Sequence, residues 1–231
     1  MHRVKRQMRQ MSSKHRRSIR LRGYDYTQPG AYFVTVCTYD REHLFGEVID
    51  GEMRVNEFGQ IVQEEWFRTA QVRPYVQLQP DEFVVMPNHV HGIIWIVDDD
   101  ATDARAQRSI VGAQRRPVVG AQRRCAPTAD VPHVVPGSLG AIVRAIKSAV
   151  TKRINILRNT PGASVWQRNY WEHIIRTERA LQAIRRYIRD NPLRWDMDRY
   201  NAEATRSDPV AREIREMLQD ESQHTSSNDR R

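Results

Sequence analysis

The chain has 231 residues, enough for one globular domain with extensions. Hydrophobic residues make up 39% of it and charged residues 28%, and its longest apolar run, residues 93–97, is far shorter than the roughly 18 residues that a membrane span requires. Its two cysteines exclude both a disulfide framework and a four-thiolate metal site. With no signal peptide at its start, the sequence predicts a protein of the reducing cytoplasm without a membrane anchor.

The net charge is confined to the first 23 residues. This segment carries nine Lys and Arg, among them Arg16 and Arg17, and no acidic residue, whereas the rest of the chain has 28 basic and 28 acidic residues. The whole net charge of +9 therefore lies on a terminal arm, which suits contact with a nucleic acid through release of counterions. A solvated tail that aids solubility and an organelle transit peptide are the alternatives.

The first half of the chain predicts strands around one helix. Residues 31–39 are rich in β-branched and aromatic residues and predict a strand, and residues 45–55 predict a hairpin that turns at Asp50-Gly51. A helix begins after Asn56, a suitable N-cap. Two further strands follow at 81–86 and 89–97, and the second is apolar on both faces, so we expect it to be central and covered on both sides.

The second half predicts two helices beyond an inserted loop. Residues 98–136 are rich in Asp, Ala, Arg, Pro and Gly and repeat the hexapeptide VGAQRR, which favours a loop. A helix follows the N-cap Ser138, residues 165–175 are extended, and a final helix over about 178–190 ends near Asn191-Pro192. The charged tail from Asn201 onward is expected to add little to the core.

This order of elements predicts an α+β fold in which helices pack on one face of an antiparallel sheet. We divide the chain into a basic arm (1–23), a core domain (24–200) with the insertion at 98–136, and a charged tail (201–231).

His89 and His91 are the first candidates for chemistry. Residues two apart on a strand project from the same face, so both imidazoles can converge on one ion. A pair of imidazoles leaves much of the coordination shell of a divalent ion open, as a catalyst acting on phosphates requires. A histidine pair at a strand end is also a common structural feature, and this remains the alternative interpretation.

Tyr187 and Asn191 lie four residues apart on the last predicted helix and share one of its faces. A phenol with a pKa of about 10 is a poor nucleophile without assistance. A divalent ion held by the histidine pair and the Asn191 side-chain oxygen could polarise a phosphate placed against the Tyr187 hydroxyl. The alternative is a tyrosine that packs in the core with a solvated hydroxyl.

Four cations lie largely off the apolar stripe of the helix that follows Ser138. A contact surface for the phosphates of a nucleic acid and a merely solvated basic face are both compatible with this pattern. The four residues are Arg144, Lys147, Lys152 and Arg153.

Three separate motifs resemble one family. The runs Val85–Ile94 (VMPNHVHGII), Trp166–Tyr170 (WQRNY) and Tyr187–Arg194 (YIRDNPLR) are similar, in the same order, to motifs of the single-tyrosine HUH transposases, and more narrowly of the REP-associated tyrosine transposases. The resemblance covers roughly residues 23–195 apart from the insertion.

The resemblance implies a ferredoxin-like, RRM-like domain that cleaves single-stranded DNA next to a hairpin such as a REP element. It implies that His89 and His91 bind the metal, with Asn191 as third ligand where mobile relatives carry glutamine, and that Tyr187 forms a 5′-phosphotyrosine link. The metal would be a divalent ion, Mg²⁺ or Mn²⁺. Magnesium prefers oxygen ligands, whereas imidazole suits manganese and later metals, so we expect Mn²⁺ to support activity at least as well as Mg²⁺. The protein would act as a monomer or a homodimer.

Two other functions remain open at this point. The same fold could bind single-stranded DNA or RNA hairpins without catalysis, by stacking bases on aromatic side chains. A zinc hydrolase built on the histidine pair would need a further Glu or Cys ligand, and the nearest glutamate before the pair, Glu82, lies seven residues upstream of His89. Tyr170 is the competing candidate for the nucleophile.

Overall fold

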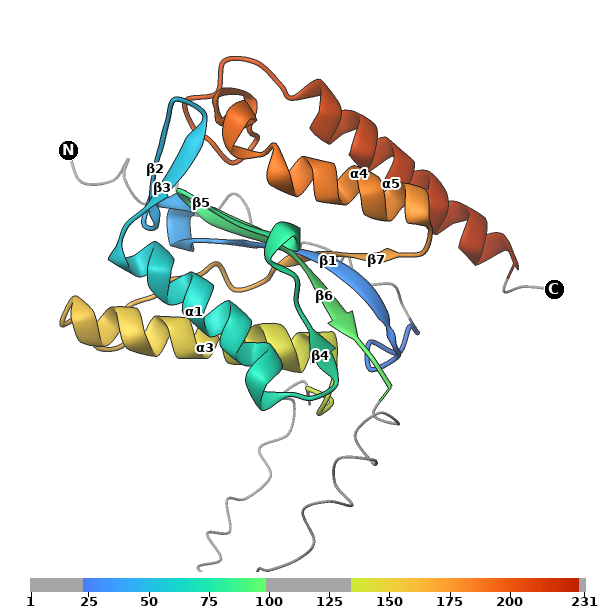
Figure 1. Ribbon diagram of the computed structural model, residues 1–231, viewed down its shortest axis with the longest axis horizontal. Helices are drawn as coiled ribbons and strands as arrows, with labels where there is room; N and C mark the ends of the chain where they lie inside the picture. Colours follow the sequence, from blue (N-terminus) through green and yellow to red (C-terminus); the bar gives the residue numbers. More distant parts are fainter. Residues whose placement is uncertain (1–22, 99–133, 229–231) are drawn as a thin grey trace, which may run out of the picture.

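The computed structural model describes residues 23–98 and 134–228 (Figure 1). Arg16, Arg17 and nearly all of both the basic arm and the predicted insertion lie outside the described residues, so those predictions are not tested. No helix in the described part is long and apolar enough to cross a membrane.

An antiparallel sheet forms the centre of the fold. Its two central strands are β1 (Gly30–Cys37) and β6 (His89–Ile96), which pair over their whole length. β7 (Trp171–Ile175) pairs with the outer side of β1, while β4 (Val76–Gln77) and β5 (Phe83–Met86) both pair with the outer side of β6. The predicted α+β class and the central position of the strand over 89–97 are confirmed.

The predicted hairpin is a separate two-stranded sheet. β2 (Gly46–Ile49) pairs with β3 (Glu52–Val55), and Asp50 and Gly51 between them have φ values of 53° and 76°. Two successive positive φ angles are what a two-residue turn of type I′ requires, so the Asp-Gly prediction is confirmed.

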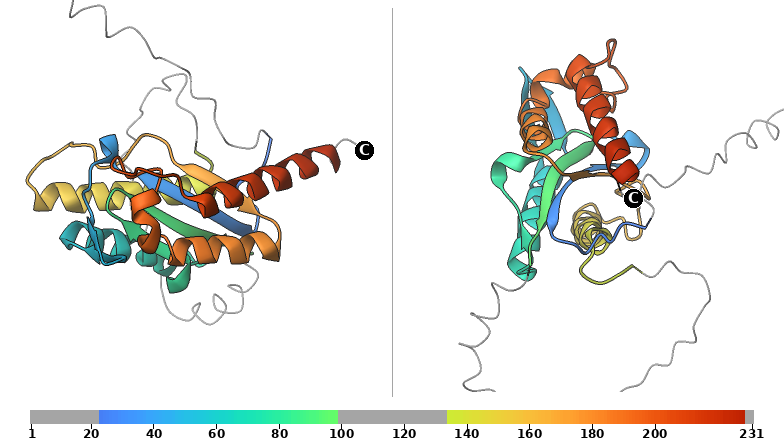
Figure 2. Two further views of the ribbon diagram at one scale, coloured as in Figure 1. Left: turned by 90° about the horizontal axis from the view of Figure 1, so that it is seen from above. Right: turned by 90° about the vertical axis from the view of Figure 1, so that its right-hand side faces the viewer.

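Helices cover both faces of the central sheet (Figure 1; Figure 2, right). On one face lie α1 (Glu57–Val72) and α3 (Leu139–Leu157), and on the other lie α4 (Glu178–Arg189) and α5 (Pro209–Asn228). The helices α1, α3 and α4 each begin after an N-cap residue whose side chain accepts hydrogen bonds from backbone N–H groups of the first turn. The caps are Asn56 and Ser138, which were predicted, and Thr177.

Successive side chains of β1 point to opposite faces of the sheet, which explains why helices pack on both faces. Tyr32, Val34 and Val36 join the core beneath α1 and α3, whereas Ala31 and Phe33 join the core beneath α4 and α5. The expected single helical layer is therefore corrected to two layers.

The C-terminal tail belongs to the second core. Ile214 and Leu218 of α5 are 8% and 3% exposed and pack with side chains of α4. The prediction that residues after Asn201 add little to the core is wrong, because the apolar residues of this charged segment fall on one side of a helix.

Short 3₁₀ helices connect the larger elements. They are η1 (Tyr39–Arg41), η2 (Pro80–Glu82) and η3 (Pro192–Met197). Glu82 is almost fully buried, and its carboxylate accepts hydrogen bonds from Trp95 of β6 and Arg185 of α4. Arg185 donates through two of its nitrogens, and together these hydrogen bonds join α4 to the sheet.

Gly92 of β6 lets an aromatic ring pack against the sheet. A Cβ built on this residue would overlap the ring of Trp66, which itself stacks on Phe83 at 4.5 Å. We expect Gly92→Ala to lower the free energy of unfolding by about 1–3 kcal/mol, because the added methyl group overpacks the core. Urea unfolding measures the effect.

The matched control for Gly92→Ala is the same change combined with Trp66→Phe, which removes the ring atoms that the methyl group meets. The double variant should lose less stability than the sum of the two single changes. Purely additive losses would contradict this packing explanation.

Candidate active site

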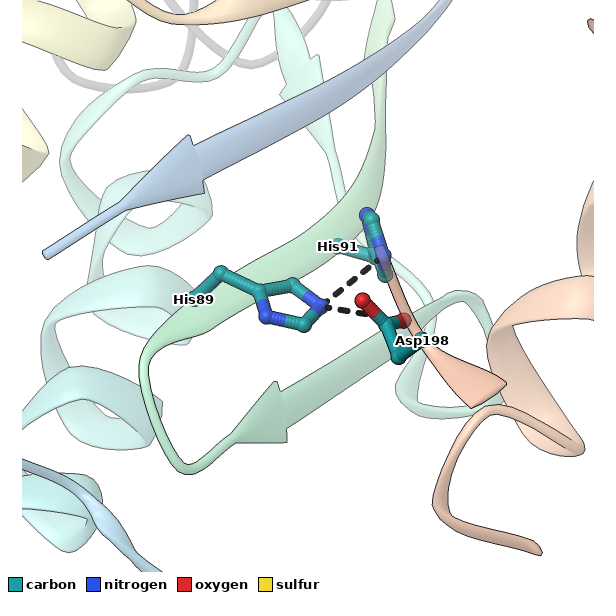
Figure 3. Close-up of side chains that lie close together, drawn as sticks. All are labelled: His89, His91 and Asp198. Carbon is teal, nitrogen blue, oxygen red and sulfur yellow. Dashed lines mark hydrogen bonds and ion pairs between the residues drawn. The ribbon is translucent and has the colours of Figure 1, made fainter. Parts of the chain in front are cut away.

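Two buried imidazoles face each other at the start of β6. His89 and His91 are 0% and 2% exposed, and their Nε2 atoms lie 3.1 Å apart (Figure 3). The predicted convergence of the pair from one face of a strand is therefore present in the structure.

The surroundings set which imidazole nitrogens are free. The Asn88 amide nitrogen donates to the carbonyls of Arg41 and Tyr200, at 3.2 and 2.8 Å, so its amide oxygen is turned toward His89 Nδ1 at 2.9 Å. His89 Nδ1 therefore carries the proton and Nε2 presents a lone pair. The Thr35 hydroxyl lies 2.8 Å from His91 Nδ1 and can fix the second ring in the same way.

Asp198 lies beside the imidazole pair, and sequence reasoning missed it. Its Oδ2 atom is 3.9 Å from His89 Nε2, and ligand atoms of His89, His91 and Asp198 all lie within 4.8 Å of one another (Figure 3). Burial raises the pKa of this carboxyl group. Asp198 follows η3 in a stretch with several charged residues, where nothing in the sequence pattern distinguishes a buried carboxylate from solvated ones.

Asn191 lies two residues beyond the last residue of α4, at the start of η3, and is 1% exposed. Its backbone keeps helical angles, φ −61° and ψ −43°, so it continues the face that carries Tyr187. Its Nδ2 atom is 3.4 Å from Asp198 Oδ2, and its buried Oδ1 has no hydrogen-bond partner among the described residues.

Tyr187 of α4 places its hydroxyl against the histidine pair. The side chain is 6% exposed, and its Oη atom lies 3.4 Å from His91 Nε2. Burial raises the pKa of this phenol, and the neighbouring Asp198 carboxylate adds to that increase. The structure thus brings the four residues predicted for this site, Asn191 among them, into one cluster with Asp198.

The cluster fits a divalent cation. It offers two neutral imidazole nitrogens, a carboxylate and a buried amide oxygen that no described residue hydrogen-bonds, and two hydrogen bonds orient the rings from behind. Mixed nitrogen and oxygen donors of this kind suit Mn²⁺ and other first-row metals, and the oxygens also suit Mg²⁺.

Buried histidines on this side of the sheet make the fold sensitive to acid. Burial lowers the pKa of His91 to about 3 and, with a smaller effect from Arg176, that of His173 to about 4. Below pH 6.5 each of them binds fewer protons in the folded than in the unfolded protein. The free energy of unfolding should therefore fall as the pH falls, by up to about 1.4 kcal/mol per pH unit for each histidine.

Urea unfolding at pH 7 and pH 5 without divalent metal measures this dependence. His173→Gln should flatten the profile, because one of the depressed titrations is removed. A variant that keeps the wild-type slope would show that His173 accepts its proton freely in the folded state.

The cluster is closed to large ligands. Tyr200 packs against His89 with the rings tilted and their centroids 4.6 Å apart, and the guanidinium groups of Arg199 and Arg41 lie 4.6 and 5.7 Å from the Tyr200 ring. On the other side, α5 encloses a cavity of only about 40 Å³ that His91 and Tyr187 line. That volume holds about one water molecule and no nucleotide.

The predicted nucleic-acid-binding cations of α3 lie on the opposite face of the sheet from this cluster. Arg144 and Lys152 are exposed. Lys147 Nζ donates to the carbonyls of Gln167 and Arg168 at 2.6 and 3.2 Å, and Arg153 forms an ion pair with Glu65 at 2.9 Å. The structure therefore does not bring these four residues to the histidine pair, and their contact with DNA stays a prediction.

No family model matches the chain. A protein of Haemophilus influenzae described as uncharacterized is 37% identical over 184 residues, which is 80% of this chain and 92% of that protein. The chain belongs to the family of this Haemophilus protein. The alignment spans nearly the full length of the relative.

The chain is also similar to solved structures. A REP-associated tyrosine transposase bound to a REP hairpin is 20% identical with a TM-score of 0.46, over 76% of this chain and 73% of that one. A predicted transposase of Deinococcus radiodurans is 18% identical with a TM-score of 0.36, over 73% of this chain and 94% of that one.

Proposed function

We propose that the protein is a metal-dependent endonuclease and strand transferase that cleaves single-stranded DNA next to a hairpin, as the single-tyrosine HUH transposases do. One observation carries the proposal: the Tyr187 hydroxyl lies 3.4 Å from Nε2 of His91, within a buried pair of imidazoles. Two of the three sequence motifs that resemble this family contribute residues of that cluster.

Residues of the cluster would hold the metal. His89 and His91 present nitrogen donors, and Asp198 and Asn191 present oxygens beside them. When bound, a divalent ion supplies Lewis acidity and orientation to the scissile phosphate. The hydrogen bond that His89 Nδ1 donates to the Asn88 amide oxygen, and the one between His91 Nδ1 and the Thr35 hydroxyl, keep both rings in place without rearrangement.

Tyr187 would act as the nucleophile. Its phenolic oxygen forms a bond to phosphorus as the bond to the 3′-oxygen breaks, and the phenolic proton ends on the released 3′-hydroxyl. The 5′-phosphate stays on the tyrosine. Because one phosphodiester replaces another, a later 3′-hydroxyl can reverse the step without ATP. The rigid position of Tyr187 on α4 reduces the entropic cost of the attack.

DNA can reach the cluster only if part of the cover moves. Tyr200 lies over the imidazoles, and Ile214 and Leu218 of α5 close the side next to Tyr187. The exposed guanidinium groups of Arg41 and Arg199 flank Tyr200 and would meet an approaching phosphate first. The proposal therefore requires a shift of this cover on binding.

The burial of the cluster also favours a second candidate, a protein that binds single-stranded DNA or RNA hairpins without chemistry. Incubation with labelled hairpin DNA and Mn²⁺ followed by a denaturing gel separates the two functions. An enzyme yields a covalent band whose DNA ends at the tyrosine-linked 5′-phosphate. A binder yields a shift on native gels only.

Mn²⁺ should support cleavage at least as well as Mg²⁺, because two of the donors are imidazoles, which magnesium binds poorly. Adduct yield measured over a range of each metal checks this expectation. Cleavage with Mg²⁺ but none with Mn²⁺ would contradict it. Tight stoichiometric zinc in the purified protein would instead favour a zinc hydrolase that uses Asp198 as its third ligand.

A further inference from the structure

A groove runs along α3, on the side of the sheet opposite the candidate active site. It lies between the second half of α3 and the segment 159–168, which turns back from the end of the helix and runs beside it toward β7 (Figure 1; Figure 2, left). Its volume of about 890 Å³ lies within the range of about 300–1,000 Å³ that is usual for ligand clefts.

The lining of this α3 groove combines positive charge with apolar surface. Among the described residues, three cations line it, Lys147, Lys152 and Arg168, and no carboxylate does. Ile156 is 70% exposed and provides apolar surface in the groove, whereas Trp166 belongs to the core behind the groove wall and is only 8% exposed. Cations around an apolar floor match a polyanion that also carries flat aromatic bases.

The neighbouring cation of α3 shows that the charge of the groove is not a general property of the helix. Arg153 follows Lys152 directly but forms ion pairs with Glu64 and Glu65 of α1, on another side of the helix. The side that faces the groove has no such carboxylates in the part of the chain that the structure describes. Its positive charge is therefore available to an external anion.

Lys147 holds the wall of the α3 groove rather than facing outward. Its ammonium group donates to the carbonyls of Gln167 and Arg168, and burial lowers its pKa to about 8. The side chain thus fixes the backbone next to Arg168. Lys152 and Arg168 themselves are exposed and remain available for phosphates.

The wall of the groove is joined to the catalytic end of the sheet. Gln167 N donates to the Cys37 carbonyl at 2.9 Å, and the Thr38 hydroxyl donates to the Asn88 carbonyl at 3.0 Å. Asn88 in turn orients His89. The wall is thus two strand spacings, about 10 Å, from the strand that carries the histidine pair.

We propose that the α3 groove binds the unpaired DNA strand next to the scissile phosphate, with Lys152 and Arg168 on its phosphates and a base against Ile156. The strand would pass around the end of the sheet from the catalytic face to the groove. This inference rests on the proposed action on single-stranded DNA, and it assigns the place where the strand outside the hairpin is held.

The test compares two DNA ligands with matched variants. One ligand is a hairpin with single-stranded extensions, and the other is the same hairpin without them. Fluorescence anisotropy at several salt concentrations gives the affinity for the wild type, for Lys152→Gln combined with Arg168→Gln, and for a control that combines Arg68→Gln with Arg179→Gln. The control residues are exposed cations that do not line the groove.

We expect the groove variant to bind the extended hairpin about tenfold more weakly. In a plot of the logarithm of the binding constant against the logarithm of the salt concentration, the magnitude of the slope should fall by about 0.7 for each phosphate that the variant no longer neutralises. Its affinity for the hairpin without extensions, and both affinities of the control, should stay at the wild-type values. Iodouracil placed in the extension should crosslink to a peptide of the segment 159–168.

Wild-type affinity of the groove variant for the extended hairpin would overturn the inference, as would an equal loss for both ligands or a homodimer in solution that covers the groove. The covalent adduct at saturating DNA is a separate readout. If the wild type forms the adduct but the groove variant binds the extended hairpin normally, the assignment of the α3 groove is wrong and the proposed cleavage stands. If the wild type forms no adduct but the groove variant loses affinity for the extended hairpin only, the proposed cleavage is wrong and the assignment of the α3 groove stands.

Discussion

Replacement of Tyr187 by phenylalanine is expected to abolish the covalent protein–DNA adduct. The change removes only the hydroxyl that lies 3.4 Å from His91 Nε2, which is the group proposed to attack phosphorus. A lost nucleophile should reduce the adduct by at least about a thousandfold. Denaturing gels with end-labelled hairpin DNA and Mn²⁺ provide the measurement.

Stability should hardly change in Tyr187→Phe, since a contact of 3.4 Å is a weak hydrogen bond and the ring is kept. Tyr170→Phe is the matched control. Tyr170 packs against the core beneath α1 and α3, on the other side of the sheet, so its variant should form the adduct normally. An adduct that survives the change at Tyr187 and disappears with the change at Tyr170 would overturn the assignment.

Replacement of His91 by alanine should remove both metal binding and cleavage. Two of the donors in the cluster are imidazoles, and the loss of one should weaken metal affinity by at least about 100-fold, which exceeds the usual effect of removing a residue that only orients a ligand. Mn²⁺ should raise the melting temperature of the wild type but not that of His91→Ala. Calorimetry and adduct yield measure the two effects.

His173→Ala controls for the loss of a buried imidazole. His173 lies on β7, is 8% exposed and is not part of the cluster, so its alanine variant should lose stability but keep the shift by Mn²⁺. Asp198→Asn extends the test to the residue that the sequence did not reveal. Normal metal binding in His91→Ala would show that the imidazole pair is structural.

Local patterns predicted much of the fold. The spacing of apolar residues and the caps Asn56 and Ser138 located α1 and α3, and Asp50-Gly51 located the hairpin turn. The second helical layer was missed because the apolar residues of α5, such as Ile214 and Leu218, are few and separated by charges. Their burial depends on the surface of α4, which no local pattern describes.

The candidate site was predictable where its residues share an element. A strand brings His89 and His91 together and a helix face brings Tyr187 and Asn191 together, whatever the rest of the fold does. Asp198 and Tyr200 follow a bend of the chain at η3, and their approach to His89 is set by tertiary packing alone. The sequence therefore revealed the two pairs but not the residues that complete and cover them.

The cluster gathers residues from nearly the whole length of the polypeptide. Thr35 comes from β1, His89 from the start of β6, and Asp198 from the segment directly after η3. During synthesis, a chain still attached to the ribosome and lacking that segment has only part of this arrangement. Under the proposed function, a fragment that ends before residue 198 would lack the complete cluster and should not cleave DNA.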